Sequence, residues 1–255
     1  MTSGIYSAMS GAVGQERQLA IVANNMANVT TTGYKADMVS FHEALTRQDE
    51  NWDPNGNAPR PVTSYKYVSI GSVQPDMVAG AMENTGRDLD LSVFGDVFFT
   101  VRTVNGDRYT RAGSFMRGID GEVQSHGGEK LLIEGGEDLP EGKVLKIPLN
   151  AREISVSPDG VVRADNAEVG RLRLRRFNSG EDLQKLGTVQ FLPKEGVEPQ
   201  IPEQVQVSQG LLERSNMGVI QGMNEIIMVN RGFESLQKLI RAFRSLDERT
   251  ARGLT

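Results

Sequence analysis

The sequence predicts an α+β protein in which long helices at both ends of the chain flank a central all-β domain. Apolar residues recur at alternating steps of three and four near the N-terminus and again near the C-terminus. This spacing keeps one face of a helix turned toward a partner helix. Between about residues 60 and 210 the pattern changes to short alternating runs separated by Gly, Pro, Asn and Asp, which is typical of strands and turns.

The N-terminal stripe belongs to a helix that we expect from about Ser3 to Val29, with Gln15 as its polar interruption. The helix should end in Thr30-Thr31-Thr32-Gly33, because β-branched residues followed by Gly disfavour continuation and allow a left-handed turn. Gly33 is therefore expected to take a positive φ. The apolar members of the stripe are Ile5, Ala8, Ala12, Leu19, Val22, Met26 and Val29.

Three asparagines, Asn24, Asn25 and Asn28, lie in the last turns of this helix. Asn lowers helix propensity, so these side chains should be compensated by hydrogen bonds. Two explanations stay open, local capping of the helix end and contacts with another subunit.

A second, shorter amphipathic helical piece is expected from Lys35 to Arg47, so that residues 1–47 form an N-terminal helical region. Residues 48–63 are polar, rich in Pro, Gly and Asn, and carry the one Trp of the chain. They are interpreted as a linker or surface loop.

Residues 64–210 form the predicted β domain, a sandwich or barrel-like arrangement of short strands. The run Leu89–Val93 alternates cleanly, which indicates a strand with one buried face. Asn105-Gly106 suits a tight hairpin, and Pro158-Asp159-Gly160 suits a second turn.

The strand expected at Val169–Phe177 alternates Leu with Arg. Its arginines, Arg171, Arg173, Arg175 and the following Arg176, favour a solvated strand face over a site for an acidic partner or phosphate.

Residues 211–255 form the predicted C-terminal helix, whose stripe Leu211 and Leu212 extend and Gly222 interrupts. Burial of one stripe stabilises by at most about 10–20 kcal/mol before ordering costs. Two arrangements stay open, an antiparallel hairpin within one monomer and packing against other chains in a polymer. The apolar members are Val219, Ile226, Val229, Phe233, Leu236, Ile240 and Phe243.

Composition argues against several classes of function. A net charge of −5 and a pI of 5.3 disfavour nonspecific nucleic-acid binding. The chain has no Cys, and its two histidines, His42 and His126, lack metal-ligand spacing. The opening residues lack the features of a signal peptide, and no run of eighteen apolar residues predicts a membrane span. We expect no catalytic residue, no cofactor and no metal.

Several segments, in order along the chain, resemble bacterial flagellar rod and hook proteins. They are ANNMANVTTTGYK at 23–35, NTGRDLDLSVFGDVFFTV at 84–101, RYTRAGSF at 108–115, and the stretch from LLERSN at 211–216 through the closing helix. The sequence departs from the family pattern at Val97, where Gly is usual, and at Arg87-Asp88, where Asn-Pro is usual. The first segment carries the family signature residues Asn24, Asn25, Asn28, Thr32, Gly33 and Tyr34.

This resemblance implies a non-catalytic structural subunit of the flagellar basal-body rod, the shaft that transmits torque from motor to hook. It implies that the terminal helices pack as coiled-coil-like axial elements of a helical polymer. The implied partners are copies of the chain, other rod subunits toward the motor and the hook, and the flagellar type III export apparatus. The implied location is the periplasmic rod, reached without a cleaved signal peptide and without membrane insertion.

Within the family, the opening GIYSAMSGA and the closing RGFESLQKLIRAFRSLDERTARGL are more similar to the proximal-rod subunit than to the distal one. A distal-rod subunit is the first alternative. A peptidoglycan-acting or sugar-binding β domain with helical arms, or a free-standing coiled-coil scaffold, is the alternative from another class.

Overall fold

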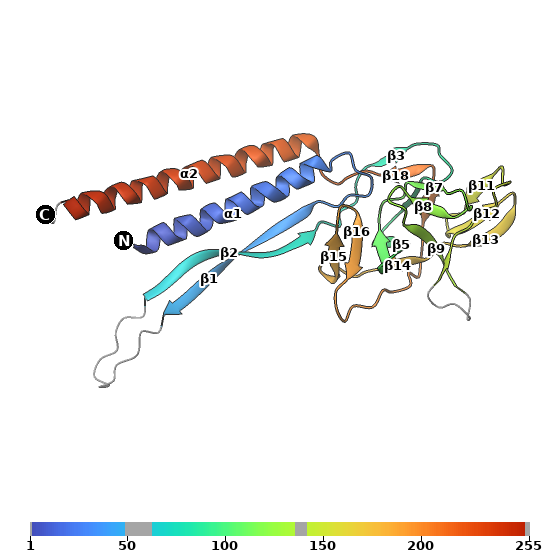
Figure 1. The fold of residues 1–255 in the computed structure, drawn as a ribbon, viewed down its shortest axis with the longest axis horizontal. Coiled ribbons are helices and arrows are strands. Elements are labelled where there is room, and N and C mark those ends of the chain that lie inside the picture. The colour runs from blue at the N-terminus through green and yellow to red at the C-terminus, as the bar shows by residue number, and fades with distance from the viewer. Residues whose placement is uncertain (1, 49–62, 136–141, 253–255) are drawn as a thin grey trace, which may run out of the picture. The chain divides into compact units, whose positions relative to one another are not determined.

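The computed structural model describes residues 2–48, 63–135 and 142–252 and has the predicted order of helix, strands and helix (Figure 1). The helices are α1 (Thr2–Ala27) and α2 (Val219–Arg252), so the expected α+β class is confirmed. The strands are β1 (Asp37–Gln48), β2 (Thr63–Pro75), β3 (Met82–Asn84), β4 (Leu91–Val93), β5 (Val97–Thr103), β6 (Gly106–Thr110), β7 (Phe115–Arg117), β8 (Val123–Ser125), β9 (Lys130–Ile133), β10 (Lys143–Val144), β11 (Ile154–Val156), β12 (Val161–Ala164), β13 (Ala167–Arg171), β14 (Leu174–Arg176), β15 (Leu183–Leu186), β16 (Gln190–Pro193), β17 (Val207–Gln209) and β18 (Leu211–Glu213), with a 3₁₀ turn, η1 (Gly180–Asp182), before β15.

The chain divides into two compact units, each built from separate stretches of sequence. The helical unit contains Met1–Met26, Met38–Val73 and Val219–Thr255, and the β unit contains Ala27–Asp37 and Gln74–Gly218. The predicted limits at 1–47, 48–63, 64–210 and 211–255 stay predictions. Most of the predicted linker lies outside the described residues.

Two predicted helical segments are strands instead. The helical piece expected from Lys35 to Arg47 is wrong, because this stretch forms β1, which pairs with β2. The extension of the C-terminal helix through Leu211 and Leu212 is also wrong, because both lie in β18 opposite Asn84 and Glu83 of β3. In each case pairing with a distant strand overrides a local apolar spacing that also fits a helix.

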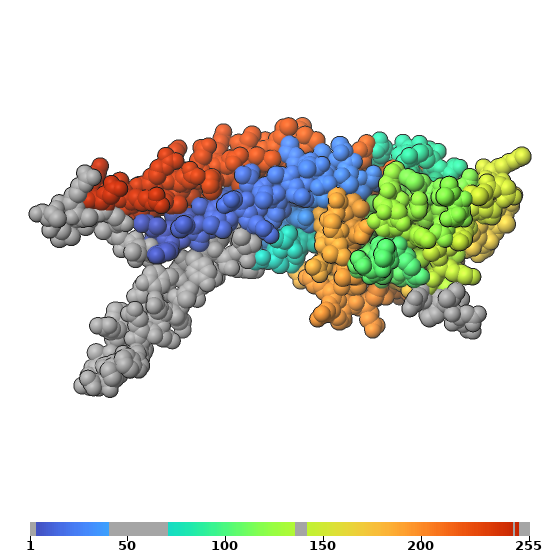
Figure 2. Space-filling view, in the orientation of Figure 1, coloured from blue at the N-terminus to red at the C-terminus, as the bar shows by residue number. Residues whose placement is uncertain are grey.

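The two helices run antiparallel and lie side by side in the helical unit (Figures 1 and 2). Small residues mark the contact, since a Cβ on Gly4 would lie 2.9 Å from Cζ of Phe243 and one on Gly11 would lie 3.4 Å from Cδ1 of Leu236. A Cβ on Gly232 would lie 3.1 Å from Oε1 of Gln15. The residue numbers of all three pairs add to 247, so one register holds along the pair.

The β unit is built on a central antiparallel sheet in the order β15-β16-β6-β5-β9-β8-β7, with β10 beside β9 and β14 beside β5. Successive residues of a strand point to opposite faces. Phe99 packs in a large core with Val97 and Val101, whereas Phe98 packs on the other side with Tyr109. Both faces of β5 are therefore buried.

The predicted hairpins and turns are confirmed. Gly106 begins β6 directly after the turn from β5 and has φ 103°, and Gly160 lies in the turn between β11 and β12 with φ 80°. Gly33 also has the expected positive φ, 68°.

The predicted solvated arginine face holds only in part. Arg171 and Arg176 are exposed, but Arg175 is buried and its Nη1 lies 2.5 Å from Oε1 of Glu134. Pairing with this half-exposed carboxylate makes burial of the guanidinium tolerable, and the alternation of Leu and Arg gives no sign of the pair.

Phe99→Ala should lower the free energy of unfolding by about 3–5 kcal/mol, because Phe99 is completely buried in the large core. Val104→Ala, at the fully exposed tip of the same hairpin, is the matched control and should change it by less than about 0.5 kcal/mol. Urea unfolding of both full-length variants measures the difference. Equal midpoints would show that the core is assigned incorrectly.

Candidate functional site

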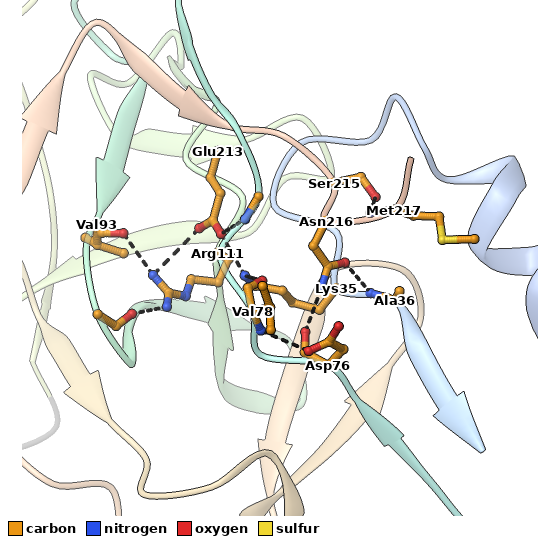
Figure 3. A network of polar contacts seen from close by, with 12 residues as sticks. Lys35, Ala36, Asp76, Val78, Val93, Arg111, Glu213, Ser215, Asn216 and Met217 are labelled. Atoms are coloured by element: carbon orange, nitrogen blue, oxygen red, sulfur yellow. Dashed lines mark hydrogen bonds and ion pairs between the residues drawn. The ribbon is translucent and has the colours of Figure 1, made fainter. Parts of the chain in front are cut away.

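Buried charges gather where the segment that follows α1 meets β18 (Figure 3). Lys35, Arg111 and Glu213 come from three distant parts of the chain, and their side chains are 1%, 3% and 1% exposed. We call this cluster, with the backbone that surrounds it, the junction. All of its residues belong to the β unit.

Glu213 is the centre of the junction. Its Oε1 lies 2.7 Å from Nζ of Lys35 and accepts a hydrogen bond of 3.0 Å from the backbone N–H of Gly80. Nζ of Lys35 also donates to the carbonyl oxygen of Val78 at 2.8 Å. These contacts join the signature segment, β18 and the chain between β2 and β3.

Arg111 lies on the other side of the carboxylate. Its Nη1 is 3.7 Å from Oε2 of Glu213 and donates to the carbonyl oxygen of Val93 at 2.9 Å, while Nη2 donates to that of Gly95. The guanidinium carbon lies 5.0 Å from the ring centroid of Phe98, at the distance of a cation–π contact. Oε2 of Glu213 has no hydrogen-bond partner among the described residues, so its interaction with Arg111 is electrostatic.

Backbone hydrogen bonds reinforce the junction. The N–H of Gly33 donates to the carbonyl oxygen of Glu213 at 2.7 Å. Asn216 accepts from the N–H of Ala36 at 2.8 Å through Oδ1 and donates to the carbonyl oxygen of Asp76 at 2.9 Å through Nδ2. The segment that leaves α1 is thereby tied to the segment that leads into α2.

Burial shapes the electrostatics of these groups. It lowers the pKa of the Lys35 ammonium, a shift that Glu213 opposes, and it lowers the pKa of Arg111. Burial also raises the pKa of Tyr34 to about 12, with a smaller contribution from Asp37. Nζ of Lys185 lies 3.8 Å from the centroid of the Tyr34 ring and donates to the carbonyl oxygen of Lys35 at 2.6 Å. The signature segment is thus held from two sides.

Gly33 is needed at its position for two physical reasons. Its φ of 68° is a conformation that a side chain disfavours. A Cβ would also lie 2.6 Å from Cα of Ala112, which is below any normal contact. Thr32, Gly33 and Tyr34 of the signature therefore form a turn that lies against the backbone beside Arg111.

The asparagines of the signature differ in environment. Asn25 is buried, Asn24 is exposed and Asn28 is half-buried. Asn28 accepts hydrogen bonds from Thr31, through its carbonyl oxygen from the Thr31 N–H at 3.1 Å and through Oδ1 from the Thr31 hydroxyl at 3.3 Å. These local bonds agree with a capping role for Asn28, and contacts of the three asparagines with another subunit stay a prediction.

The predicted assembly residues lie in α1 and α2, except Val29, which follows the end of α1 at Ala27. Leu236 and Phe243 contact the other helix, opposite Gly11 and Gly4. Val219 is 46% exposed and stands at the margin of the stripe. Their role in assembly stays a prediction. Ala8, Ala12, Val22 and Val229 are buried, whereas Ile5, Leu19, Met26, Val29, Ile226, Phe233, Leu236, Ile240 and Phe243 are half-buried.

Among the described residues, no group of three or more His, Cys, Asp or Glu side chains could hold a metal ion. His126 is exposed, and the side chain of His42 lies outside what the structure describes. No described helix is long and apolar enough to cross a membrane.

The junction is the feature that sequence reasoning missed. Each of its charged residues lies inside a segment that resembles the rod and hook family, Lys35 in TGYK, Arg111 in YTRAG and Glu213 in LERSN. The signal in the sequence is that each of these motifs contains a single charged residue among small, polar and apolar ones. It does not reveal that the three side chains meet.

Gly33→Ala should lower the free energy of unfolding by more than the roughly 1–2 kcal/mol that positive φ alone costs, because its Cβ also clashes with Ala112. Gly86→Ala is the matched control, since Gly86 has φ 65° and open space around its Cβ position. Chemical unfolding of both variants separates strain from clash. A Gly33→Ala variant no less stable than Gly86→Ala would refute the close approach.

Lys35→Met should cost about 3–5 kcal/mol of stability, because it removes the closest partner of a buried carboxylate. Arg171→Met breaks the exposed pair with Asp159, whose side chains are 59% and 57% exposed, and should cost at most about 1 kcal/mol. The two midpoints in a denaturant titration provide the comparison. If Lys35→Met is as mild as its control, the junction is not an energetic centre.

Comparison with known proteins places these features in a family. The model described as "Flagella basal body rod protein" matches residues 5–35, which span most of α1 and the turn that ends at Lys35. The model described as "Flagellar hook protein FlgE/F/G D1 domain" matches residues 92–164 of the β unit. One match therefore lies in the N-terminal helix and the turn after it, and the other lies in the β unit.

Full-length relatives agree. The chain is 30% identical to the flagellar basal-body rod protein FlgF of Rhizobium meliloti over 94% of this chain and 93% of the relative. It is 30% identical to FlgF of Caulobacter vibrioides over 94% and 93%, and 29% identical to the flagellar basal-body rod protein FlgG of Bacillus subtilis over 94% and 94%. With this identity over nearly its whole length, the chain belongs to the family of flagellar basal-body rod proteins.

Proposed function

We propose that this protein is a structural subunit of the flagellar basal-body rod, polymerising through its terminal helices into the shaft that carries torque from motor to hook. The observation that carries the proposal is the end-to-end similarity to rod proteins, which covers the helices as well as the β unit. A non-catalytic role agrees with relatives that are named as rod proteins.

The helical unit has the properties of an assembly element. The helices bury one stripe against each other, with Val22 2% and Val229 4% exposed. Other apolar side chains of both helices face solvent, among them Tyr6 at 68% and Ile220 at 77% exposed. Exposed apolar surface of this kind marks a site of protein association. Coiled-coil-like packing in the assembled rod is the arrangement that we propose for these helices.

The junction suits a subunit that carries mechanical load. The segment after α1 and the segment before α2 are tied to each other through Gly33, Ala36, Glu213 and Asn216. Separating one partner from a buried ion pair costs free energy, because the other charge would then be buried without a partner. Force transmitted along either helix therefore acts on segments that these hydrogen bonds and ion pairs hold to each other.

The finer assignment is the proximal part of the rod. It rests on the resemblance of the opening and closing segments, and relatives named FlgF and FlgG both match along the chain. We propose a periplasmic position within the basal body and delivery by the flagellar type III export apparatus without a cleaved signal peptide. Other rod subunits would be the axial neighbours.

Phe233→Asp should abolish rod assembly and swimming while export continues, because it places an unpaired charge on the half-buried face of α2. Ile240→Asp should behave in the same way. Asn230→Asp, which introduces the same residue at an exposed position of the same helix, is the matched control and should swim normally. Soft-agar motility and isolation of basal bodies are the measurements, and normal swimming of Phe233→Asp would exclude this face from assembly.

A further inference from the structure

A hollow in the β unit shares Arg111 with the junction and has a volume of about 170 Å³. We call it the aromatic hollow. Its apolar walls come from distant parts of the chain and are Phe98 of β5, Phe177 after β14, Leu183 of β15 and Met77 after β2. The first three of these side chains are buried, and Met77 is half-buried. All of them belong to the β unit, so the hollow is a product of that unit alone.

The volume of the aromatic hollow suits one aromatic ring. An engineered protein cavity of roughly 150 Å³ with walls of Leu, Ile and Phe side chains binds benzene. A volume of about 170 Å³ therefore leaves room for a ring with a small substituent. Sites for drug-sized ligands occupy roughly 300–1,000 Å³, so a ligand of that size would not fit.

The walls of the hollow favour an aromatic ring over an aliphatic group. Phe98 and Phe177 already meet edge to face, with ring centroids 5.6 Å apart and planes at 75°. An added ring would extend this cluster in the geometry that aromatic rings prefer. The thioether of Met77 and the guanidinium of Arg111 also line the hollow, and both groups attract aromatic rings. An aliphatic group would gain only the burial of its apolar surface.

Polar groups of the hollow favour a ring that carries a hydroxyl. Asp96, Asn178 and Ser179 line the hollow and are exposed to solvent. A purely apolar ligand that covered the Asp96 carboxylate would remove water from a charge without replacing its hydrogen bonds, which costs free energy. A hydroxyl on the ring would donate to the carboxylate and offset this cost. A ring with a hydroxyl is a phenol.

We propose that the aromatic hollow binds a phenol ring and that its natural occupant is a tyrosine side chain of another protein. The hollow has room for a ring and little more, and its exposed residues leave it open to solvent. The ring can therefore enter while the backbone that carries it stays outside. Because Arg111 belongs to both places, the tyrosine would dock beside the buried charges of the junction. The inference goes beyond the proposed rod function, since it concerns a site that one isolated subunit contains.

Binding is tested on the purified full-length protein with methyl-labelled methionine. The probes are p-cresol, which represents the tyrosine side chain, N-acetyltyrosinamide, which adds its backbone, and toluene, which lacks the hydroxyl. A bound ring shifts the NMR signal of the Met77 methyl group through its ring current, and Met77→Leu assigns that signal. Met116, which is exposed in β7 and does not line the hollow, is the internal control.

The expected result is a saturable shift of the Met77 signal with p-cresol and with N-acetyltyrosinamide, and none of the Met116 signal. Toluene should bind about tenfold more weakly, because it lacks the hydrogen bond to the carboxylate. Asp96→Ala should weaken p-cresol binding by the same factor without weakening toluene binding. Asp120→Ala, at an exposed position between β7 and β8, is the matched control and should leave both affinities unchanged.

Other results would overturn the inference in distinct ways. Binding of p-cresol but not of N-acetyltyrosinamide would show a site for a free phenol and exclude a protein side chain. Equal affinities for toluene and p-cresol would exclude a role for the tyrosine hydroxyl, and this comparison on the unmodified protein decides even if Asp96→Ala does not fold. If no probe gives a saturable shift of the Met77 signal, the hollow is not a binding site. None of these outcomes bears on rod assembly, which Phe233→Asp tests separately.

Discussion

A buried carboxylate in the β unit ties the segment that follows α1 to the segment that precedes α2. Glu213 comes from β18, and its positive partners Lys35 and Arg111 come from the signature segment and from the residues after β6. Taking three charges out of water is costly unless each finds a partner. The chain can therefore form these ion pairs only when the segment that follows α1 lies beside β18. The ion pairs thus favour this topology as well as stabilising the fold.

The backbone around these charges is packed so closely that several positions have no room for a side chain. A Cβ on Gly80 would lie 2.9 Å from the carbonyl carbon of Arg214, and one on Gly113 would lie 2.7 Å from that of Leu91. Both glycines, like Gly33, belong to segments that touch the junction. Close backbone approach keeps water from the charges, and low dielectric in turn strengthens the attraction between them. The close packing at the glycines and the buried ion pairs therefore depend on each other.

Local chemistry explains which features could be predicted from the sequence. The helices, the turns at Gly106 and Gly160 and the left-handed Gly33 depend on spacing and turn residues within a few positions. The apolar spacing of β1 fits both a helix and a strand, and only pairing with β2 decides between them. Burial of Arg175 depends in the same way on Glu134, about forty residues away. The junction could not be predicted because it joins three segments through contacts that leave no period in the sequence.

The sequence leaves open whether the terminal helices pack within one monomer or against other chains. The structure shows packing within the monomer, which does not exclude packing against other chains. One stripe on each helix contacts the other helix of the same chain, in a register that three glycine contacts define. Residues one position further along, such as Tyr6 and Ile220, stay exposed. A helix has room for more than one apolar row because neighbouring residues differ by about 100° in direction. The inner stripe therefore orients the two helices relative to each other, while the outer rows stay exposed.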